Sequence, residues 1–234
     1  MHKNYAQIRW LESGEPYSEL FDDIYFSHSN GLEESEYVFI QQNQLPQRWL
    51  KREKFSIAEL GFGSGLNFLA TINCWHLNSL SNSCLNYFSF EKYPFSRNDY
   101  QQMAKLIDNH WPHLSKYHQL LAQLYPLQRP IQNIYLMDGK IKLTLFYDDA
   151  CTAMENLDTL IDAWYLDGFD PKKNSQLWNQ SIYQQIVKHS NQQASFSTYT
   201  AAGHVRRGLK EAGFAVKKAK GIGQKREMLT GILE

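Results

Sequence analysis

The sequence has little cysteine, no net charge and no long apolar run. Its 234 residues contain three cysteines, and 24 Lys and Arg side chains balance 24 Asp and Glu side chains. Three cysteines without C-x-x-C spacing indicate reduced thiols rather than a disulfide framework or a zinc site. No run approaches the roughly 18–20 apolar residues of a membrane span, and the N-terminus lacks the apolar core of a secretion signal. We therefore expect a cytoplasmic protein with no metal and no membrane association.

The two ends of the chain carry opposite charges. Residues 10–47 contain eight acidic side chains and no Lys or Arg, whereas residues 203–234 contain eight basic side chains and three acidic ones. Such asymmetry can mark a nucleic-acid surface, and it is equally typical of an ordinary solvated face. Composition leaves both interpretations open.

The most informative stretch is 55–68. An apolar run, 55–60, leads into three glycines spaced G-x-G-x-G (Gly61, Gly63 and Gly65), and the next residues fit an amphipathic helix over 67–77. This order is typical of the first strand, loop and helix of a nucleotide-binding α/β sheet. Glu59 lies two residues before the first glycine. Its carboxylate would oppose the pyrophosphate of a dinucleotide but suits a cationic amino-acid group, which favours S-adenosylmethionine (SAM) over NAD.

Acidic residues also lie at the ends of three later strands of the expected sheet, and Glu91 and Asp149 belong to the first two of them. Residues 85–91 predict a strand that ends in Glu91, where an acid accepts hydrogen bonds from ribose hydroxyls; a surface Glu is the alternative. Asp149 follows the strand predicted over 141–146, and it could accept from an adenine amino group or cap the next helix.

The stretch 163–171 is the second focus of the sequence. The core strand predicted there ends at Asp167, at the same carboxyl edge of the sheet as Glu59 and Glu91. Ligands of open α/β sheets bind at this edge, so Asp167 is expected to face the same crevice. Phe169 follows Asp167, and it could form a flat wall for a ring or simply pack in the core.

The alternation of strands and helices predicts an α/β, Rossmann-like fold. We expect a seven-stranded, mostly parallel sheet with helices on both faces and an antiparallel C-terminal strand. Residues 97–125 predict helix with a break at Trp111-Pro112, and residues 214–216 and 228–233 predict a final antiparallel pair. Residues 1–50 form an N-terminal extension or lid, in which 37–40 could be strand or short helix. We expect residues 51–234 to form the sheet domain, which the resemblance described next identifies as a SAM-dependent methyltransferase domain.

Several motifs in order resemble one family, the methyltransferase domain of MnmC, the tRNA 5-methylaminomethyl-2-thiouridine biosynthesis enzyme, and its stand-alone relatives. The resemblance covers nearly the whole chain, and its motifs are residues 16–27, 59–68, 88–94, 166–169 with Pro171, Asn174 and Trp178, 198–203, 205–207 and 225–229. Asp170 and Ser175 depart from the usual pattern of the family. The bifunctional members continue into a flavin-dependent oxidase domain, and no second glycine-rich dinucleotide motif is present here.

The resemblance implies SAM-dependent N-methylation of the 5-aminomethyl group on the wobble uridine of tRNA. Asp167 is the candidate catalytic residue, since a carboxylate beside the amine could receive its proton; its competing role is to bind the SAM amino group. The residues expected to bind the cofactor are Glu59, Gly61, Gly63, Gly65, Asn67, Glu91, Lys92, Asp149, Ala150 and Asp167.

The wobble base has to leave its stack to enter such a site. Tyr25, Phe26 and Phe169 are candidates for an aromatic clamp, with Ser27 beside them, and Arg206, Lys225 and Arg226 are candidates for phosphate contacts. The expected partners are tRNA and a flavin-dependent oxidase domain, in cis or in trans.

Two other functions remain open from the sequence. One is a methyltransferase or aminopropyltransferase that acts on a free small amine, which the acidic N-terminal third would suit. The other is a SAM-binding or RNA-binding module without catalysis. The fold alone does not choose among them.

Overall fold

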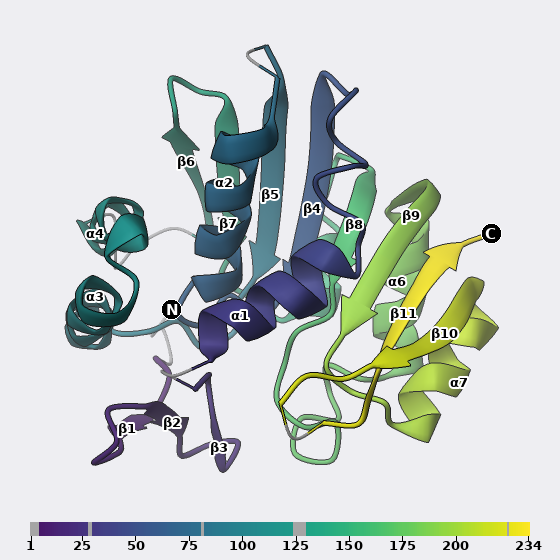
Figure 1. Ribbon diagram of the computed structural model, residues 1–234. Helices are drawn as coiled ribbons and strands as arrows, with labels where there is room; N and C mark the ends of the chain where they lie inside the picture. The colour runs from purple at the N-terminus through teal and green to yellow at the C-terminus, as the bar shows by residue number, and fades with distance from the viewer. Residues whose placement is uncertain (1–4, 28–29, 81, 124–129, 224) are drawn as a thin grey trace.

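The computed structural model describes residues 5–27, 30–80, 82–123, 130–223 and 225–234. Within these residues a large eight-stranded sheet has helices on both faces, and a small three-stranded sheet lies near one end of it (Figure 1). The strand order of the large sheet is β10-β11-β9-β8-β4-β5-β7-β6. Strands β7, β5, β4, β8 and β9 are parallel neighbours, whereas β6 and β11 run antiparallel to theirs. The predicted α/β fold with a mostly parallel sheet is confirmed.

The large sheet is formed by β4 (Lys54–Leu60), β5 (Cys84–Phe90), β6 (Ile131–Leu136), β7 (Ile141–Phe146), β8 (Ile161–Tyr165), β9 (Ser190–Thr198), β10 (Phe214–Lys220) and β11 (Glu227–Leu233). The small sheet is formed by β1 (Ile8–Trp10), β2 (Pro16–Ser18) and β3 (Asp23–Ile24). The helices are α1 (Gly31–Ser35), its π-helical continuation η1 (Glu36–Gln41), α2 (Leu66–Asn78), α3 (Arg97–His110), the 3-10 turn η2 (Pro112–Leu114), α4 (Ser115–Gln123), α5 (Ala150–Met154), α6 (Gln180–Lys188) and α7 (Gly203–Ala212).

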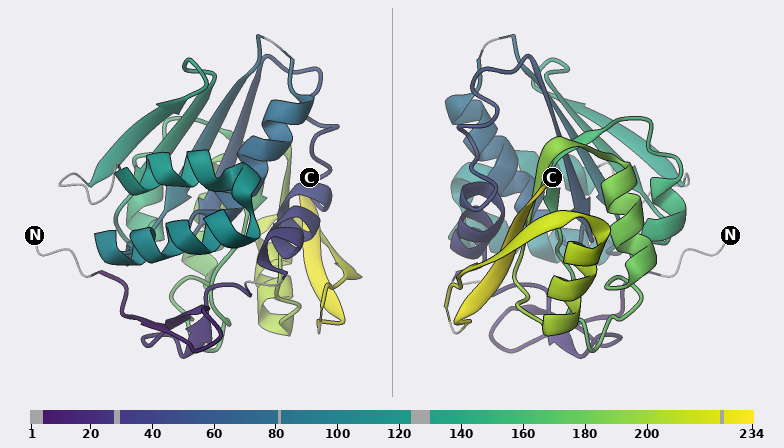
Figure 2. Two further views of the ribbon diagram at one scale, coloured as in Figure 1. Left: turned by 60° about the vertical axis from the view of Figure 1, so that its left-hand side comes forward. Right: turned by 90° about the vertical axis from the view of Figure 1, so that its right-hand side faces the viewer.

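Each face of the large sheet packs on its own apolar cluster. Along β4, Phe55 and Ile57 point into the cluster under η1, α2 and α3, while Ala58 and Leu60 point into the cluster under α5, α6 and α7. Figure 2 shows these two sets of helices on opposite sides of the sheet. Because both faces are covered, successive residues of the central strands are buried, from Phe55 to Leu60 in β4 and throughout β8, as expected for a parallel sheet.

The expected number of strands in the sheet was wrong by one. Residues 131–136 form β6, which pairs with β7 through a turn in which Met137, Asp138 and Gly139 have φ of 50°, 55° and 84°. No strand was predicted there, because this edge strand buries only Ile134 and Leu136 and its pattern is weak. The predicted helix break at Trp111-Pro112 is confirmed, and the last two residues of that predicted helix, 124–125, lie outside the described residues.

The N-terminal segment has two parts with different packing. Residues 8–24 form the small sheet, whereas the helical turns from Gly31 onward bury Val38, Phe39 and Trp49 completely in the main core. Residues 37–40, for which both strand and short helix were left open, are helical and belong to η1. The division of the chain at residue 50 into extension and domain stays a prediction.

A polar network holds this second part against the sheet near the amino-terminal ends of β4, β8 and β9, away from the glycine loop. Arg48 donates from Nη2 to the carbonyl oxygens of Asp162 and Gln193, each at 3.0 Å. Asp162 is 4% exposed, and its carboxylate accepts from Arg52 Nη1 at 2.8 Å and from Ser56 N at 2.9 Å. Asn191 Nδ2 donates to it as well, at 2.9 Å. One buried carboxylate therefore joins β4, β8 and β9.

Replacing this carboxylate is expected to destabilise the fold strongly. In Asp162→Ala, the Ser56 amide and the Asn191 side chain lose their acceptor inside the protein, which should lower the free energy of unfolding by about 3 kcal/mol. Lys51→Ala is the control: that residue is exposed on the same turn, so its loss should change the free energy of unfolding by less than about 0.5 kcal/mol. Urea unfolding of both variants measures the difference, and equal losses would contradict the role given to Asp162.

Candidate active site

A cleft of about 1610 Å³ opens at the carboxyl ends of the central strands. The order β8-β4-β5 means that the chain leaves β4 toward β5 on one side and returns later to β8 on the other. This reversal is the topological switch point at which open α/β sheets bind ligands. The walls are the glycine loop, the small sheet, the segment 168–178, the segment 198–204 and the loop before β11.

The glycine loop turns the chain sharply between β4 and α2. Gly61, Gly63 and Gly65 have φ of 82°, 50° and 80°, in the left-handed region that favours glycine. A Cβ on Gly63 would lie 3.2 Å from the Tyr25 ring, so the loop and the small sheet are in close contact. Gly61 and Gly63 line the cleft, whereas Gly65 occupies the N-cap position of α2 and is not part of the lining.

Asn67, on the first turn of α2, joins two carboxyl groups. Its Nδ2 donates to Glu59 Oε1 at 2.9 Å and to Asp167 Oδ2 at 2.7 Å. Ser89 Oγ donates to the other oxygen of Glu59 at 2.9 Å. Glu59 is completely buried and does not line the cleft, so the structure differs from the expectation that this side chain faces a ligand directly. Asn67 covers Glu59 and is itself part of the cleft wall.

Burial shifts the acid–base behaviour of both carboxyls. Burial, followed by the nearby charge of Asp167, raises the pKa of Glu59 well above its usual range. Burial also raises the pKa of Asp167 to about 6, although the hydrogen bonds from Asn67 and from the Gly168 amide oppose the shift. A partly exposed carboxyl with a pKa near neutrality, placed in a cleft, is typical of a functional site.

The acids at the ends of β5 and β7 also line the cleft. Burial raises the pKa of Glu91, and hydrogen bonds from the backbone amides of Gly63 and Tyr93, both 2.8 Å long, oppose this shift. Asp149 caps α5 by accepting from Cys151 N at 3.1 Å. The capping role considered for Asp149 is therefore confirmed, while its contact with an adenine stays a prediction.

Lys92 links these two strand ends across the cleft. Its Nζ lies 3.3 Å from Asp149 Oδ2 and 3.2 Å from Gln176 Oε1. Ala150 lies beside this pair in the cleft wall. The predicted cofactor residues Glu91, Lys92, Asp149 and Ala150 are thus gathered in one region of the cleft.

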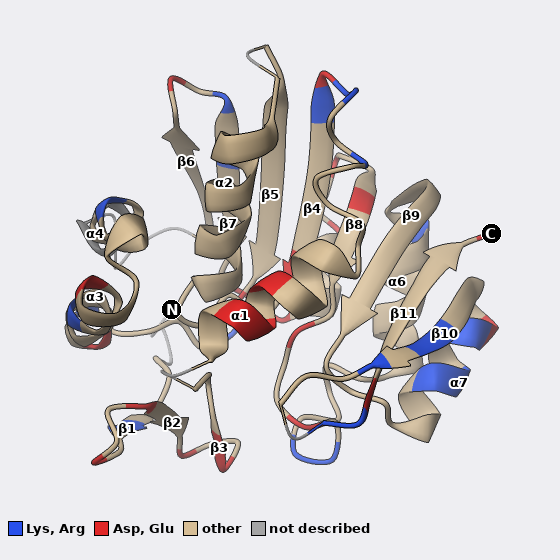
Figure 3. Cartoon of the chain, in the orientation of Figure 1, with Lys and Arg blue, Asp and Glu red and all other residues tan. Residues whose placement is uncertain are grey.

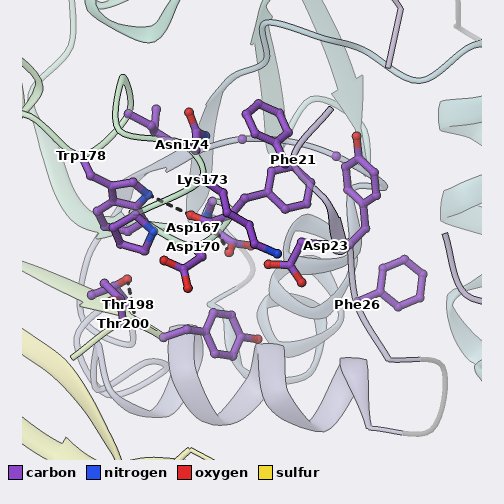
Figure 4. A pocket seen from close by; sticks show the side chains of 18 of the residues that line it. Phe21, Asp23, Phe26, Asp167, Asp170, Lys173, Asn174, Trp178, Thr198 and Thr200 are labelled. Carbon is purple, nitrogen blue, oxygen red and sulfur yellow. Dashed lines mark hydrogen bonds between the residues drawn. The ribbon is translucent and has the colours of Figure 1, made fainter. Parts of the chain in front are cut away.

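Aromatic rings from the small sheet and the 168–178 segment meet over the cleft. Phe21 stacks on Phe169 with ring centroids 4.5 Å apart, and the Tyr25 ring lies edge-on to Phe169 at 5.0 Å. Lys173 donates to the carbonyl oxygen of Asp22 in the same region. In Figure 4, Asp167 lies between Trp178 on one side and Phe21 on the other.

The structure distinguishes the other residues predicted to bind substrate. Phe26 and Ser27 both line the cleft, although Phe26 is only 9% exposed and its ring also packs near Trp111. Lys225 and Arg226 line it too, whereas Arg206 on α7 does not. Figure 3 shows basic residues on α7, β10 and the loop before β11, and acidic residues on α1. Phe21, Glu34 and Tyr199 also line the cleft, although none of them was predicted as a site residue.

The described residues offer neither a metal site nor a membrane-spanning helix. No group of three or more His, Cys, Asp and Glu side chains there is arranged to hold a metal ion. None of the described helices has the length and apolar character needed to cross a membrane.

Residues 112–234 match a family described as S-adenosyl-L-methionine-dependent methyltransferase. The chain is 45% identical over 242 residues to the tRNA 5-methylaminomethyl-2-thiouridine biosynthesis bifunctional protein MnmC of Vibrio campbellii (strain ATCC BAA-1116), covering 98% of this chain and 35% of that protein. It is 44% identical over 229 residues to the protein of the same name from Marinomonas sp. (strain MWYL1), covering 97% and 33%. The chain thus spans about a third of the length of these curated relatives.

A solved structure has the same fold. The crystal structure of MNMC2 from Aquifex aeolicus superposes with a TM-score of 0.75 at 20% sequence identity, covering 100% of this chain and 71% of that chain. At this identity the similarity bears on the fold alone.

The raised pKa of Asp167 predicts that Asp167→Asn stabilises the protein at neutral pH. The folded-state pKa, about 6, lies above the ordinary value of 3.8, so ionisation of Asp167 costs stability as the pH rises from about 4, and the cost is complete above about 7. Asparagine has no such ionisation. The variant should gain about 1 kcal/mol at pH 8, a value reduced for partial exposure, and nothing at pH 4.

Thermal unfolding at both pH values measures this gain, which corresponds to a few degrees in the midpoint. Asp158→Asn is the control, because Asp158 is exposed outside the cleft. Identical midpoints of Asp167→Asn and the parent at pH 8 would show that the carboxyl is not held in an unfavourable environment.

Proposed function

Since the chain belongs to the family of S-adenosyl-L-methionine-dependent methyltransferases, we propose that it methylates the 5-aminomethyl group on the wobble uridine of tRNA. The observation that carries this proposal is the identity of 45% over 98% of the chain to proteins named for 5-methylaminomethyl-2-thiouridine biosynthesis in tRNA. The cleft adds a carboxyl group whose pKa, about 6, suits proton transfer near neutrality.

The residues of the cleft fit SAM as the methyl donor. The left-handed glycines let the backbone approach a ligand closely, and the amino-terminal end of α2 adjoins the same loop. We propose that the residues that hold or shape this subsite are Gly61, Gly63, Gly65, Asn67, Glu91, Lys92, Asp149, Ala150 and Asp167, with Glu59 acting through Asn67. When bound, SAM supplies an electrophilic methyl group on a sulfonium sulfur.

We propose that Asp167 handles the proton of the substrate amine. An alkylamine is mostly protonated at pH 7 and has to lose a proton before its lone pair can attack. Above pH 6 most Asp167 side chains are ionised and can accept that proton. Asn67 and the Gly168 amide hold the two carboxylate oxygens at 2.7 and 2.8 Å, which fixes the direction in which Asp167 faces the cleft.

The aromatic cluster suits a base that has left its stack. We propose that Tyr25, Phe169 and Phe21 contact the flipped uracil, with Phe26 supporting them from the core and Ser27 at the rim. Lys225 and Arg226, which line the cleft, and Arg206 on α7 would contact the phosphates of the anticodon loop.

The remaining steps require other parts or partners. We propose that residues 1–50 act as an extension whose small sheet closes over the bound base, and that residues 51–234 form the methyltransferase domain.

A flavin-dependent oxidase, in cis or in trans, would remove the carboxymethyl group and so supply the amine. The reaction would take place in the cytoplasm, where tRNA is modified.

Methyl transfer to tRNA tests the proposal directly. The protein is incubated with labelled SAM and tRNA that lacks the final wobble methyl group, and the nucleosides are then analysed. One additional methyl on the aminomethyl group is expected. Asp167→Ala should lower kcat by about 100-fold or more, because proton transfer by a positioned carboxylate contributes that much, and kcat of the parent should rise as the pH increases through about 6.

The exposed Asp158→Ala serves as the control and should keep the parent rate. If the parent protein binds SAM but labels no tRNA, the proposal fails. Label in a free small amine would then favour a small-molecule methyltransferase.

A further inference from the structure

The loop before β11 places a cation inside the cleft. Lys225 Nζ lies 5.0 Å from the centroid of the Tyr199 ring, a distance typical of a cation–π contact. The loop is closed by two backbone hydrogen bonds, from Gly221 N to the Arg226 carbonyl at 3.0 Å and from Lys225 N to the Ile222 carbonyl at 3.1 Å. Lys225 and Tyr199 both belong to the cleft lining.

The Tyr199 ring is held from behind by the N-terminal helix. It lies edge-on to the fully buried Phe39 of η1, with centroids 5.2 Å apart at 85°. The same helix carries Glu34, which is half-buried and also lines the cleft. A Cβ on Gly223 would lie 3.4 Å from Glu34 Oε1, so this carboxylate reaches the loop that carries Lys225.

The charge of the Lys225 ammonium affects the pKa values of two carboxyl groups, those of Glu34 and Asp167. Burial raises the pKa of Glu34, and the charge of Lys225 opposes that shift. The charge of Lys225 also lowers, and that of Glu34 raises, the pKa of Asp167. Glu34 and Asp167 therefore lie close enough to one cation, and to each other, for their charges to interact.

Lys225 is held differently from the other lysines of the cleft. Lys92 pairs with Asp149 at 3.3 Å and Lys173 with Asp22 at 3.4 Å. In the described part of the chain, Lys225 and Glu34 take part in no ion pair of 4.0 Å or less. The Lys225 ammonium thus contacts an aromatic face, shares the cleft with two acids and has no ion-pair partner among the described residues, so the competing contacts that another cation would have to displace are few.

We propose that Glu34, Asp167 and the face of Tyr199 form an ammonium subsite, which Lys225 fills here and which the primary amine of the substrate takes when it binds. This inference rests on the proposed function, because it names the group of the wobble nucleoside that the subsite recognises. An aromatic face with two carboxylates suits a primary alkylammonium. The displaced Lys225 then becomes available to the phosphates that enter with the nucleotide. Glu34 is a specificity residue in this arrangement, and Asp167 is the proton acceptor.

Equilibrium binding of two nucleosides tests the subsite without any methyl transfer. The probes are 5-aminomethyluridine and uridine, which differ by the aminomethyl group alone. The parent protein is expected to prefer 5-aminomethyluridine, and Glu34→Gln is expected to lose about tenfold of that preference, the effect of about one charge contact. Lys225→Met, which leaves the subsite vacant, is expected to bind 5-aminomethyluridine several-fold more tightly than the parent.

Two exposed residues provide matched controls. Glu33→Gln changes a neighbouring acid on the same helix, and Lys217→Met changes an exposed lysine on β10; both should bind like the parent. Glu34→Asp keeps the charge and should retain most of the preference. Circular dichroism and unfolding midpoints confirm that each variant is folded.

The outcomes separate this inference from the proposed function. An unchanged preference in Glu34→Gln, weaker nucleoside binding by Lys225→Met, or no preference in any protein would each overturn the subsite. Methyl transfer to tRNA by the parent protein would still stand in those cases. Conversely, a Glu34-dependent preference in a protein that labels no tRNA would support the subsite and refute the tRNA substrate.

Discussion

The cleft depends on one amide that donates to two acids, the fully buried Glu59 and the partly exposed Asp167. Asn67 has a single side-chain nitrogen with two hydrogens, and it directs them to Glu59 and Asp167. Glu59 comes from the end of β4, Asp167 from the segment after β8, and Asn67 from the first turn of α2. A carboxyl group as buried as Glu59 requires such partners, since an unpaired one would be very costly. The hydrogen bonds therefore fix three elements relative to one another at the point where the ligand is expected.

A second polar network lies at the other end of the central strands, where the strands begin. Asp162 and Arg48 hold the N-terminal helical turns against β8 and β9, far along the strands from the glycine loop. These turns also carry Glu34 and pack Phe39 against Tyr199. The polar network that holds the turns therefore also holds this part of the cleft wall in place. The small sheet has a different kind of attachment, made largely of aromatic contacts such as Phe21 with Phe169. One N-terminal segment thus combines a fixed wall and a separately packed cover.

What the sequence could predict was local, and what it missed was long-range. The glycine loop, the strand ends at Glu91 and Asp167, and the helix break at Trp111 follow from short motifs whose geometry depends on neighbouring residues. Strand β6 exists because it pairs with β7, and its own residues give only a weak pattern. Phe21 and Tyr199 lie in the motifs 16–27 and 198–203, but neither motif indicates that these side chains reach the cleft, and Glu34 lies in no motif. Glu59 was identified by its position, but only the packing of α2 shows that Asn67 stands between it and the cleft.

The raised pKa of Asp167 also links ligand binding to proton release. At pH values near 6 a substantial fraction of Asp167 side chains carry a proton, and a cation that enters the cleft favours the ionised form. Each binding event then delivers part of a proton to the solvent, where the buffer takes it up. The heat measured by titration calorimetry consequently contains the ionisation enthalpy of the buffer, and it changes between phosphate and Tris even though the cleft and its ligand are the same.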